Sequence, residues 1–351
     1  MPQKDCENHM LKQKNSEKRG QIEPIPERGS TKRTVLNIND LKTYFFTGEG
    51  VLKAVDGVSF LLREDETIGL VGESGSGKTV TSLSILRLIS RPGRIVGGSV
   101  LLDGEDLLKK SEREMAHIRG HKISMILQDP MTSLNPVFTI GNQVAEAIGI
   151  HQRARGHRLW EKTVEILKLV RIPSPEKRIS DYPHQMSGGM RQRVVGATAL
   201  SCRPEVLIAD EPTTSLDVTI QAQYLNLLRE VQDQLHLAMI FITHDLGIVA
   251  KICDRVAVMY AGKIVESAPM RELFHNPIHP YTAALLESLP KLGGRQKWLT
   301  TIEGQPPSLL NLPPGCRFSP RCSQVDDHCL EEYPPSVTIN ENHTVSCWRA
   351  V

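Results

Sequence analysis

A glycine-rich segment between an apolar run and a helical pattern constrains the fold more than any other feature of this sequence. The run from Ile68 to Val71 is typical of a buried strand, and the letters VTSLSILRLI after Lys78 place apolar residues at helical spacing. Between them lies GESGSGKT, residues 72–79, which matches the pattern GxxxxGKS/T of a phosphate-binding loop. A strand, a glycine loop and a helix in this order predict an α/β fold with a phosphate site at the end of the strand.

The residue types of this loop fit the chemistry of a bound triphosphate. Glycines let the backbone turn its N–H groups inward around a phosphate, and the start of the next helix adds its positive dipole end. Lys78 is expected to reach the β- and γ-phosphates, and the hydroxyl of Thr79 is expected to bind Mg²⁺. The loop residues predicted to bind the nucleotide are Gly72, Ser74, Gly75, Ser76, Gly77, Lys78 and Thr79.

A second apolar run ends in two adjacent acids. Val206 to Ala209 leads into Asp210 and Glu211, which places both carboxylates after a buried parallel strand, at the edge of the sheet where ligands bind. Successive side chains of a strand point in opposite directions, which suits two separate roles. Asp210 is predicted to bind Mg²⁺, and Glu211 to be the general base that polarises the attacking water. Beside a phosphate loop, the alternative of a solvated acidic turn is less favoured.

Two more apolar runs end in polar side chains that fit the same site. LAMIFITHD ends near His244, which is predicted to contact the γ-phosphate and to hold the attacking water in line. ISMILQD ends near Gln128, whose carbonyl oxygen is predicted to bind Mg²⁺ or water. Either residue alone is a weak signal, because a lone histidine after an apolar run is usually structural. The predicted catalytic residues are Glu211, His244 and Gln128, and the predicted magnesium ligands are Thr79, Gln128 and Asp210.

Between these runs lies the segment YPHQMSGGMRQRVVGATAL, which completes an ordered set of motifs. From about Val35 to Glu266, the order of these motifs resembles that of the ATP-binding subunits of ABC transporters. The resemblance implies that the nucleotide is ATP and that the protein is an ATPase. It also implies an α/β core with a mostly parallel sheet, an antiparallel β subdomain and a helical subdomain that carries the family's signature.

The signature of this family is represented here by Ser187, Gly188 and Gly189. In the family it caps the γ-phosphate held by the opposing subunit, so the resemblance implies a dimer with ATP between two subunits. A serine hydroxyl and two glycines before a helical pattern fit that task. Asp217 is then expected at the contact between the subunits. The family's usual LSGGQ appears as MSGGM, which puts a role for glutamine at position 190 in doubt but leaves phosphate capping unaffected.

The family also stacks an aromatic side chain on the adenine. Tyr44, Phe45 and Phe46 are the candidates, and the spacing to Lys78 favours Phe45. Each of these rings would otherwise be ordinary strand core.

Several longer strings narrow the resemblance to one subfamily. GVLKAVDGVSF, QDPMTSLNP, ADEPTTSLDVTIQAQ, HPYTAALLESLP and GCRFSPRC resemble the ATP-binding subunits of oligopeptide, dipeptide and nickel importers. This resemblance implies a peripheral protein on the cytoplasmic face of the membrane. It also implies a second ATPase subunit, commonly a different chain, two transmembrane permeases and an external solute-binding protein.

Two alternatives from other classes remain open. One is a soluble ABC ATPase of DNA repair or translation, but such proteins typically carry tandem ATPase units or long coiled coils, and this chain has one phosphate loop. The other is an ATP-binding redox sensor, which would rest on the cysteines alone. A formal net charge of +2 argues against a nucleic-acid partner.

Four of the seven cysteines lie close to the C-terminus, at Cys316, Cys322, Cys329 and Cys347. Clustered thiols indicate a metal before a disulfide in a reducing compartment. No C-x-x-C pair is present, so chemistry alone leaves iron–sulfur, zinc and unligated thiols open. The family resemblance implies a [4Fe–4S] cluster, whose negative charge Arg317 and Arg321 could offset.

Composition divides the chain into three parts. Residues 1–33 carry more basic than acidic side chains and no aromatic ring, which predicts a disordered polar tail. Residues 34–267 are the predicted ABC ATPase domain, with a helical insertion from Leu134 to Ser180. Prolines near Ala268 mark the predicted start of a small cysteine-containing extension, residues 268–351.

Overall fold

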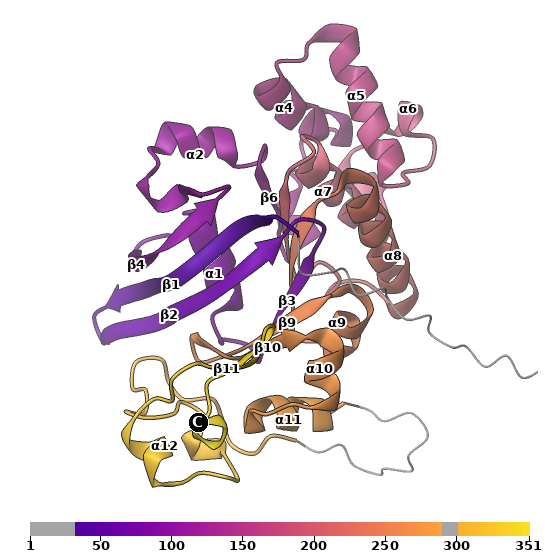
Figure 1. The fold of residues 1–351 in the computed structure, drawn as a ribbon. Coiled ribbons are helices and arrows are strands. Elements are labelled where there is room, and N and C mark those ends of the chain that lie inside the picture. The colour runs from indigo at the N-terminus through magenta and orange to yellow at the C-terminus, as the bar shows by residue number, and fades with distance from the viewer. Residues whose placement is uncertain (1–31, 290–300) are drawn as a thin grey trace, which may run out of the picture. The chain divides into compact units, whose positions relative to one another are not determined.

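The computed structural model describes residues 32–289 and 301–351, and Arg33–Val351 forms one compact unit (Figure 1). The predicted disordered tail lies outside the described residues, apart from Lys32 and Arg33. Among the helices of the described ranges, none combines the length and the apolar character needed to cross a bilayer.

A mixed sheet of eight strands lies at the centre of the unit, in the order β11-β12-β10-β9-β3-β8-β7-β6. The five strands from β9 to β6 run parallel, whereas β10, β12 and β11 pair antiparallel. The strands are β3 Thr67–Val71, β6 Ile123–Ile126, β7 Val206–Asp210, β8 Ala238–Thr243, β9 Arg255–Tyr260, β10 Lys263–Pro269, β11 Val337–Asn340 and β12 His343–Val345. The mostly parallel sheet predicted from the apolar runs is confirmed.

Both faces of the central strands are covered, which explains why their sequences are almost continuously apolar. In β7, Leu207 belongs to one apolar cluster and Ile208 to the other, because successive side chains point to opposite faces. Phe241 and Ile242 repeat this alternation in β8. The carboxyl ends of β3, β7 and β8 are therefore held in register by buried residues on two sides.

A second, antiparallel sheet packs beside the first, in the order β2-β1-β4-β5. Its strands are β1 Thr34–Thr47, β2 Gly50–Arg63, β4 Gly93–Leu102 and β5 Glu105–Asp106. The helix α1, Lys78–Ile85, contacts β1, β2 and β7, so it lies between the two sheets. This is the antiparallel β part that the sequence predicts before and after the phosphate loop. A 3₁₀ turn, η1 Leu107–Lys109, and the helix α2, Glu112–Ile118, follow it.

Helices occupy most of the chain between β6 and β7, at the top of Figure 1. They are α3 Pro130–Ser133, α4 Ile140–Gln152, α5 Gly156–Leu169, α6 Pro175–Arg178, η2 Pro183–Gln185 and α7 Gly188–Leu200. The helix α4 begins where the hydroxyl of Thr139 accepts a hydrogen bond from the backbone N–H of Asn142, and it buries Ile140, Val144 and Ile148 on one side. The predicted helical insertion falls in this region. The helix α8, Val218–Leu235, follows β7 in the chain and covers the sheet.

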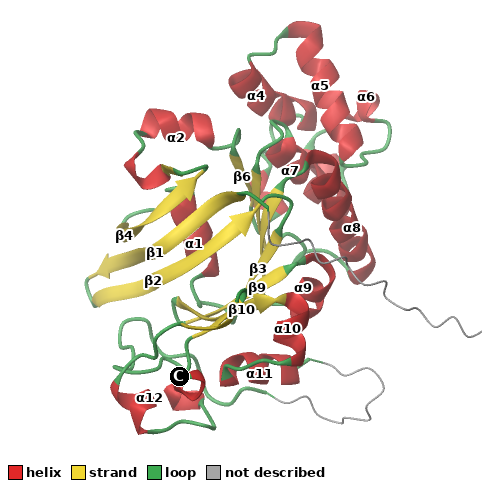
Figure 2. Cartoon of the chain, viewed as in Figure 1, coloured by secondary structure: helices red, strands yellow, loops and turns green. Residues whose placement is uncertain are grey.

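The C-terminal region consists mainly of loops (Figure 2). In this region, residues 268–351, the short helices are α10 Met270–His275, α11 Pro280–Glu287, η3 Ser319–Arg321, α12 Asp327–Glu331 and η4 Trp348–Ala350; α9, Leu246–Ile252, precedes it, between β8 and β9. β12 extends the central sheet by pairing with β10, and the buried imidazole of His343 lies 2.8 Å from a carboxylate oxygen of Glu266 on β10. The boundary predicted near Ala268 falls inside β10, so a continuous strand links the two predicted parts.

Candidate nucleotide site

The loop from residue 72 to residue 77 joins β3 to α1 and needs glycine at both ends. Gly72 and Gly77 have φ angles of 154° and 104°. A Cβ atom on Gly72 would lie 2.1 Å from the carbonyl oxygen of Met259, and one on Gly77 would lie 2.2 Å from that of Ala54. The neighbouring strands therefore approach the loop too closely for any side chain at these two positions.

Lys78 is the first residue of α1 and folds back over its own loop. Its Nζ atom donates hydrogen bonds to the carbonyl oxygens of Gly72 at 2.8 Å and Glu73 at 2.9 Å. Burial lowers the pKa of Lys78, and the carboxylates of Glu211 and Asp210 offset this only in part. The site therefore holds a buried positive charge at the mouth of the loop, where a phosphate would be stabilised.

Thr79 and Asp210 bring two oxygen ligands together from different elements. The Oγ1 atom of Thr79 lies 3.3 Å from the Oδ1 atom of Asp210, at the end of β7. Burial raises the pKa of Asp210, and the nearby charge of Glu211 adds to this effect. A hydroxyl beside a carboxylate fits Mg²⁺, which prefers oxygen ligands and takes others from phosphate and water.

Glu211 directly follows β7 and accepts hydrogen bonds from three side chains. Its Oε2 atom accepts from Nε2 of Gln128 at 2.9 Å and from Oγ1 of Thr214 at 3.0 Å. Its Oε1 atom lies 3.2 Å from Nδ1 of His244. Partial burial alone would raise the pKa of Glu211, but the hydrogen bonds from His244 and Thr214 outweigh it and lower the pKa. The carboxylate is thereby kept ionised, as a general base must be.

The structure thus brings Gln128 and His244 to Glu211 from the ends of β6 and β8. The sequence predicts that Gln128 contacts Mg²⁺ or water, whereas here its amide group donates to the carboxylate of Glu211. The sequence does not indicate Thr214 as a site residue, because a threonine in the loop PTTSLD carries no signal of its own.

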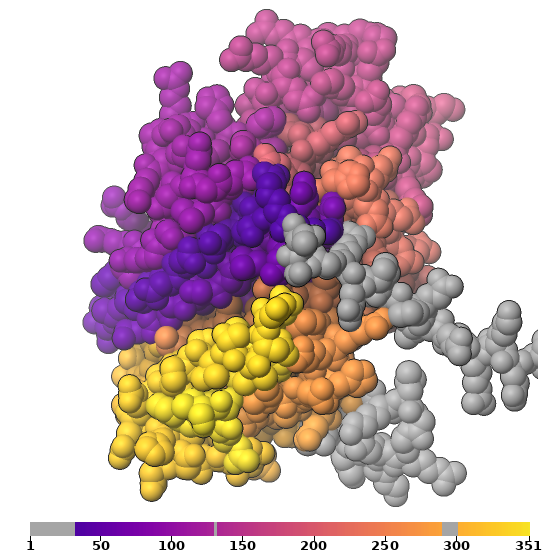
Figure 3. Space-filling view, in the orientation of Figure 1, coloured from indigo at the N-terminus to yellow at the C-terminus, as the bar shows by residue number. Residues whose placement is uncertain are grey.

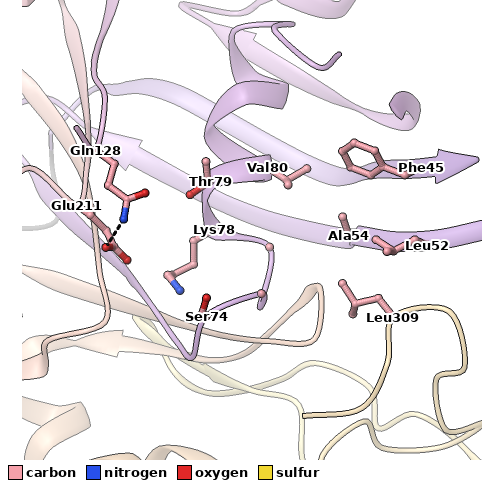
Figure 4. A pocket seen from close by; sticks show the side chains of 12 residues that line it. Phe45, Leu52, Ala54, Ser74, Lys78, Thr79, Val80, Gln128, Glu211 and Leu309 are labelled. Atoms are coloured by element: carbon pink, nitrogen blue, oxygen red, sulfur yellow. Dashed lines mark hydrogen bonds between the residues drawn. The ribbon is translucent and has the colours of Figure 1, made fainter. Parts of the chain in front are cut away.

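Lys78, Thr79, Gln128 and Glu211 line one cavity of about 400 Å³ that has two chemically different ends (Figure 4). The polar end is lined by Ser74, Lys78, Thr79, Gln128 and Glu211, and the apolar end by Phe45, Leu52, Ala54 and Leu309. Of the three candidate rings, Phe45 faces this cavity, whereas Tyr44 donates its hydroxyl hydrogen to Asp56 and Phe46 is 45% exposed. A nucleotide has the same division between an apolar base and a charged phosphate chain.

The signature residues lie elsewhere in the chain. Ser187 caps α7 by accepting a hydrogen bond from the backbone N–H of Met190 at 3.3 Å, and Asp217 caps α8. Gly189 packs against α8, since a Cβ atom there would lie 2.7 Å from Cγ2 of Ile220. Ser187, Gly188 and Asp217 are exposed, and within the described part of the chain none of them lines the cavity that holds Lys78.

Comparison with known proteins shows which family has these features. The family described as "ABC transporter" matches residues 55–214, and the one described as "Oligopeptide/dipeptide transporter, C-terminal region" matches residues 265–329. A probable peptide ABC transporter ATP-binding protein y4tR of Sinorhizobium fredii is 52% identical over 318 residues, which is 90% of this chain and 95% of that protein. The oligopeptide transport ATP-binding protein AppD of Bacillus subtilis is 48% identical over 90% of this chain and 96% of its own.

This chain belongs to the ATP-binding proteins of oligopeptide/dipeptide ABC transporters. Solved structures agree with that family's fold. A dimeric structure of the bacterial ABC transporter cassette MJ0796 matches with a TM-score of 0.60 and 25% identity, over 67% of this chain and 99% of that one. The structure of cbiO1 from Clostridium perfringens matches with a TM-score of 0.59 and 24% identity, over 69% and 91% of the two chains. The predicted family and the predicted ABC-type fold are confirmed.

The C-terminal region of this ABC ATP-binding protein reaches the phosphate loop. The Nη1 and Nη2 atoms of Arg321 donate to the two carboxylate oxygens of Glu73 at 2.7 and 3.0 Å, and the backbone N–H of Glu73 donates to the hydroxyl of Tyr281 at 3.0 Å. Arg317 makes a single contact with a carboxylate, from Nη2 to Oδ2 of Asp56 on β2, and its Nη1 atom donates to the carbonyl oxygen of Ala261. The sequence suggests that both arginines could offset the charge of a metal cluster, and in the structure each also pairs with a carboxylate of the ATPase core. Figure 3 shows the C-terminal segment, in yellow, lying against the first strands, in indigo.

The four C-terminal cysteines line one small cavity together with His279 and Trp348; they are Cys316, Cys322, Cys329 and Cys347. Burial raises the pKa of the Cys316 thiol to about 11, and the other three thiols add to this effect. The fold therefore brings together thiols that are separated in the sequence. Across the residues that the structure describes, however, no three or more His, Cys, Asp or Glu side chains are arranged to hold a metal ion.

Proposed function

We propose that this chain is the ATPase subunit that energises peptide import through an ABC transporter. The observation that carries this proposal is the carboxylate of Glu211, which accepts hydrogen bonds from three side chains beside Lys78 and the phosphate loop. Membership of the oligopeptide/dipeptide family, and the peptide transport named for the relatives, support the substrate class. The transported peptide is selected outside this chain, by the other components of the transporter.

In the proposed site, the nucleoside lies at the apolar end of the cavity, with its base against Phe45. The phosphates lie along the backbone N–H groups of the loop, over the residues Gly72, Ser74, Gly75, Ser76, Gly77 and Thr79. The side chain of Lys78 turns from the carbonyl oxygens of the loop to the β- and γ-phosphates. Thr79, Asp210 and Gln128 hold Mg²⁺, which neutralises charge on those phosphates when it is bound.

Hydrolysis then needs one proton transfer at a defined place. Glu211 accepts a proton from water, the water oxygen bonds to the γ-phosphorus, and the bond from that phosphorus to the bridging oxygen of ADP breaks. His244 and Gln128 position the carboxylate and the water. Because both already lie within 3.2 Å of Glu211, the side chains around the general base need little rearrangement before the reaction.

The second half of each site is supplied by another subunit. Ser187, Gly188 and Gly189 are proposed to cap the γ-phosphate bound to the partner's loop, and Asp217 to lie at that contact. The exposure of Ser187 and Gly188 at the start of α7, and of Asp217 at the start of α8, supports this arrangement. ATP binding closes the dimer, hydrolysis reopens it, and the motion reaches two permeases through the segment after Gln128. The proposed partners are therefore a second, commonly different, ATPase chain and two permeases at the cytoplasmic face of the membrane, with an external solute-binding protein.

Residues 34–267 are proposed as the ATPase domain and residues 268–351 as an appended region with a [4Fe–4S] cluster. Four thiols around one cavity support the cluster, which would link loops that build little core of their own. Protein purified without oxygen should be brown and carry about four irons per chain. Cys316→Ser should lose the iron, and Cys253→Ser, at a buried thiol elsewhere, should keep it. One zinc per colourless chain would replace the iron assignment.

The function is tested by separating ATP binding from hydrolysis. Glu211→Gln should bind ATP as the wild-type chain does and slow hydrolysis by about 10²–10⁴, the usual contribution of a positioned general base. Lys78→Ala should instead weaken ATP binding. Hydrolysis at the wild-type rate in Glu211→Gln would show that another group is the base.

A further inference from the structure

The apolar end of the nucleotide cavity is closed by a side chain from the C-terminal region. Phe45, Leu52 and Ala54 come from β1 and β2, whereas Leu309 comes from a loop more than 250 residues further along the chain. Figure 4 shows Leu309 on the side of Phe45 and Leu52, away from Lys78 and Glu211. The match to the ABC transporter family ends at residue 214, so Leu309 lies outside the part of the chain that matches that family.

The position of Leu309 is fixed by its backbone. β2 is the edge strand of the antiparallel sheet, and its Lys53 N–H donates to the carbonyl oxygen of Leu309 at 3.3 Å. Leu309 itself lies in a turn, in which the N–H of Asn311 donates to the carbonyl oxygen of Ser308 at 3.0 Å. The side chain of Leu309 is half-buried and packs against the main apolar cluster. A leucine anchored in this way is a preformed wall of the cavity, because the strand edge holds its backbone in place.

The same segment continues along the phosphate loop. Pro306 and Pro307 line a smaller hollow together with Glu73, Ser74 and Gly75. Neither proline has a backbone N–H, and both have a fixed φ angle, so this stretch is stiff without donating hydrogen bonds to the loop. The segment from residue 306 to residue 309 therefore follows the site from its phosphate end to its nucleoside end.

We propose that Leu309 contacts the nucleoside of bound ATP and that Leu309 and Phe45 together enclose the base between apolar surfaces. The inference rests on the proposed function and adds a binding residue to the same site. A purine base has apolar faces, and burying them against leucine and phenylalanine removes apolar surface from water. The phosphates contribute nothing to this contact. The C-terminal region is then part of the ATP site, in addition to any role of its cysteines.

The test compares two ligands that share phosphates but differ in the nucleoside. Isothermal titration of the full-length chain with ATP and with inorganic tripolyphosphate gives both dissociation constants. Leu309→Ala should weaken ATP binding about three- to tenfold, the effect of losing a small apolar contact area, and Leu309→Asp should weaken it further. Binding of tripolyphosphate should not change in either variant. Leu310→Ala is the matched control, because Leu310 lies outside the cavity lining, and it should bind both ligands normally.

Two results would overturn the inference. Normal ATP affinity in both Leu309 variants would show that the side chain does not touch the nucleoside. Equal weakening of ATP and tripolyphosphate would show that the substitution acts through the phosphate loop. Lys78→Ala distinguishes these two results from a failure of the proposed site, because this variant should bind both ligands more weakly. If the wild-type chain binds neither ligand, or Lys78→Ala binds both normally, the proposed site fails, and the inference fails with it.

Discussion

The phosphate loop and the signature use the same physical device, a glycine-containing start of a helix, and they differ in what surrounds it. At the loop, α1 begins between two sheets, Lys78 is 6% exposed, and Arg321 and Tyr281 hold Glu73. At the signature, α7 begins at the surface, and the hydroxyl of Ser187 accepts a hydrogen bond from its own helix start. One helix start is enclosed by its own chain and the other is left open.

This difference indicates that the two helix starts have different roles in binding phosphate. Backbone N–H groups at a helix start bind phosphate wherever they are exposed to it, but affinity also requires a nearby positive charge and a fixed loop. The loop has Lys78, and its geometry is fixed by residues from β2, β9, α11 and η3. The signature has a hydroxyl and N–H groups without a lysine of its own. It is suited to recognising a phosphate that another site already holds.

Among the contacts that surround the phosphate loop, the largest effect is expected from removing those of Arg321. Arg321→Gln removes both hydrogen bonds to Glu73, so ATP itself must order the loop when it binds. ATP should therefore bind about five- to tenfold more weakly, as expected for the entropy lost on ordering roughly one residue. The free energy of unfolding should fall by about 1–3 kcal/mol, because Glu73 loses charged hydrogen-bond donors. Titration calorimetry and thermal unfolding measure the two effects.

Two further variants make this result specific. Arg271→Gln, at an exposed arginine on α10, should change neither quantity. Glu73→Gln removes the ion pair but leaves the hydrogen bonds of Arg321 to Tyr260 and to the carbonyl oxygens of residues 302 and 303. It should weaken ATP binding as Arg321→Gln does, and the double variant should bind ATP little worse than Arg321→Gln alone. Normal ATP affinity in Arg321→Gln, together with lower stability, would make the contact purely structural.

A smaller effect is expected from Thr214. Its hydroxyl donates to the ionised form of Glu211, so Thr214→Val should raise the pKa of Glu211. The general base would then be protonated at higher pH than in the wild type, and the acid limb of the hydrolysis rate should move to higher pH by up to about one unit. The pH profile of kcat measures this shift. Thr338→Val, on β11, should leave the profile in place, and an unmoved limb in Thr214→Val would mean that this hydroxyl does not tune the base.

The sequence alone predicts those parts of the site that are local. The segment from Ile68 to Thr79 contains its strand, its turn and its helix start, so residue types and spacing are sufficient. The acids after β7 are placed in the same way, because a buried strand fixes where Asp210 and Glu211 emerge. The mostly parallel sheet and the antiparallel part are what the family resemblance implies, and the structure has both.

The parts that the sequence could not predict are contacts between distant segments. Nothing near Arg321 indicates that it pairs with Glu73, and Leu309 lies in a proline-rich stretch that reads only as a loop. Both contacts depend on the C-terminal region returning to the edge of β2 and to the phosphate loop. Gln128 illustrates a finer limit, since the end of a strand predicts its position but not that its amide would donate to Glu211.

The central claim is that one chain's phosphate loop works with another chain's signature, and mixing two variants tests it directly. Lys78→Ala damages the loop, and Ser187→Arg fills the proposed phosphate contact of the signature with a long side chain. Each variant alone should hydrolyse ATP poorly, under conditions in which the wild-type chain is active. A mixture should recover hydrolysis well above the sum of the two, because mixed dimers contain one intact loop facing one intact signature. A mixture no more active than its separate components would contradict a site shared between two chains.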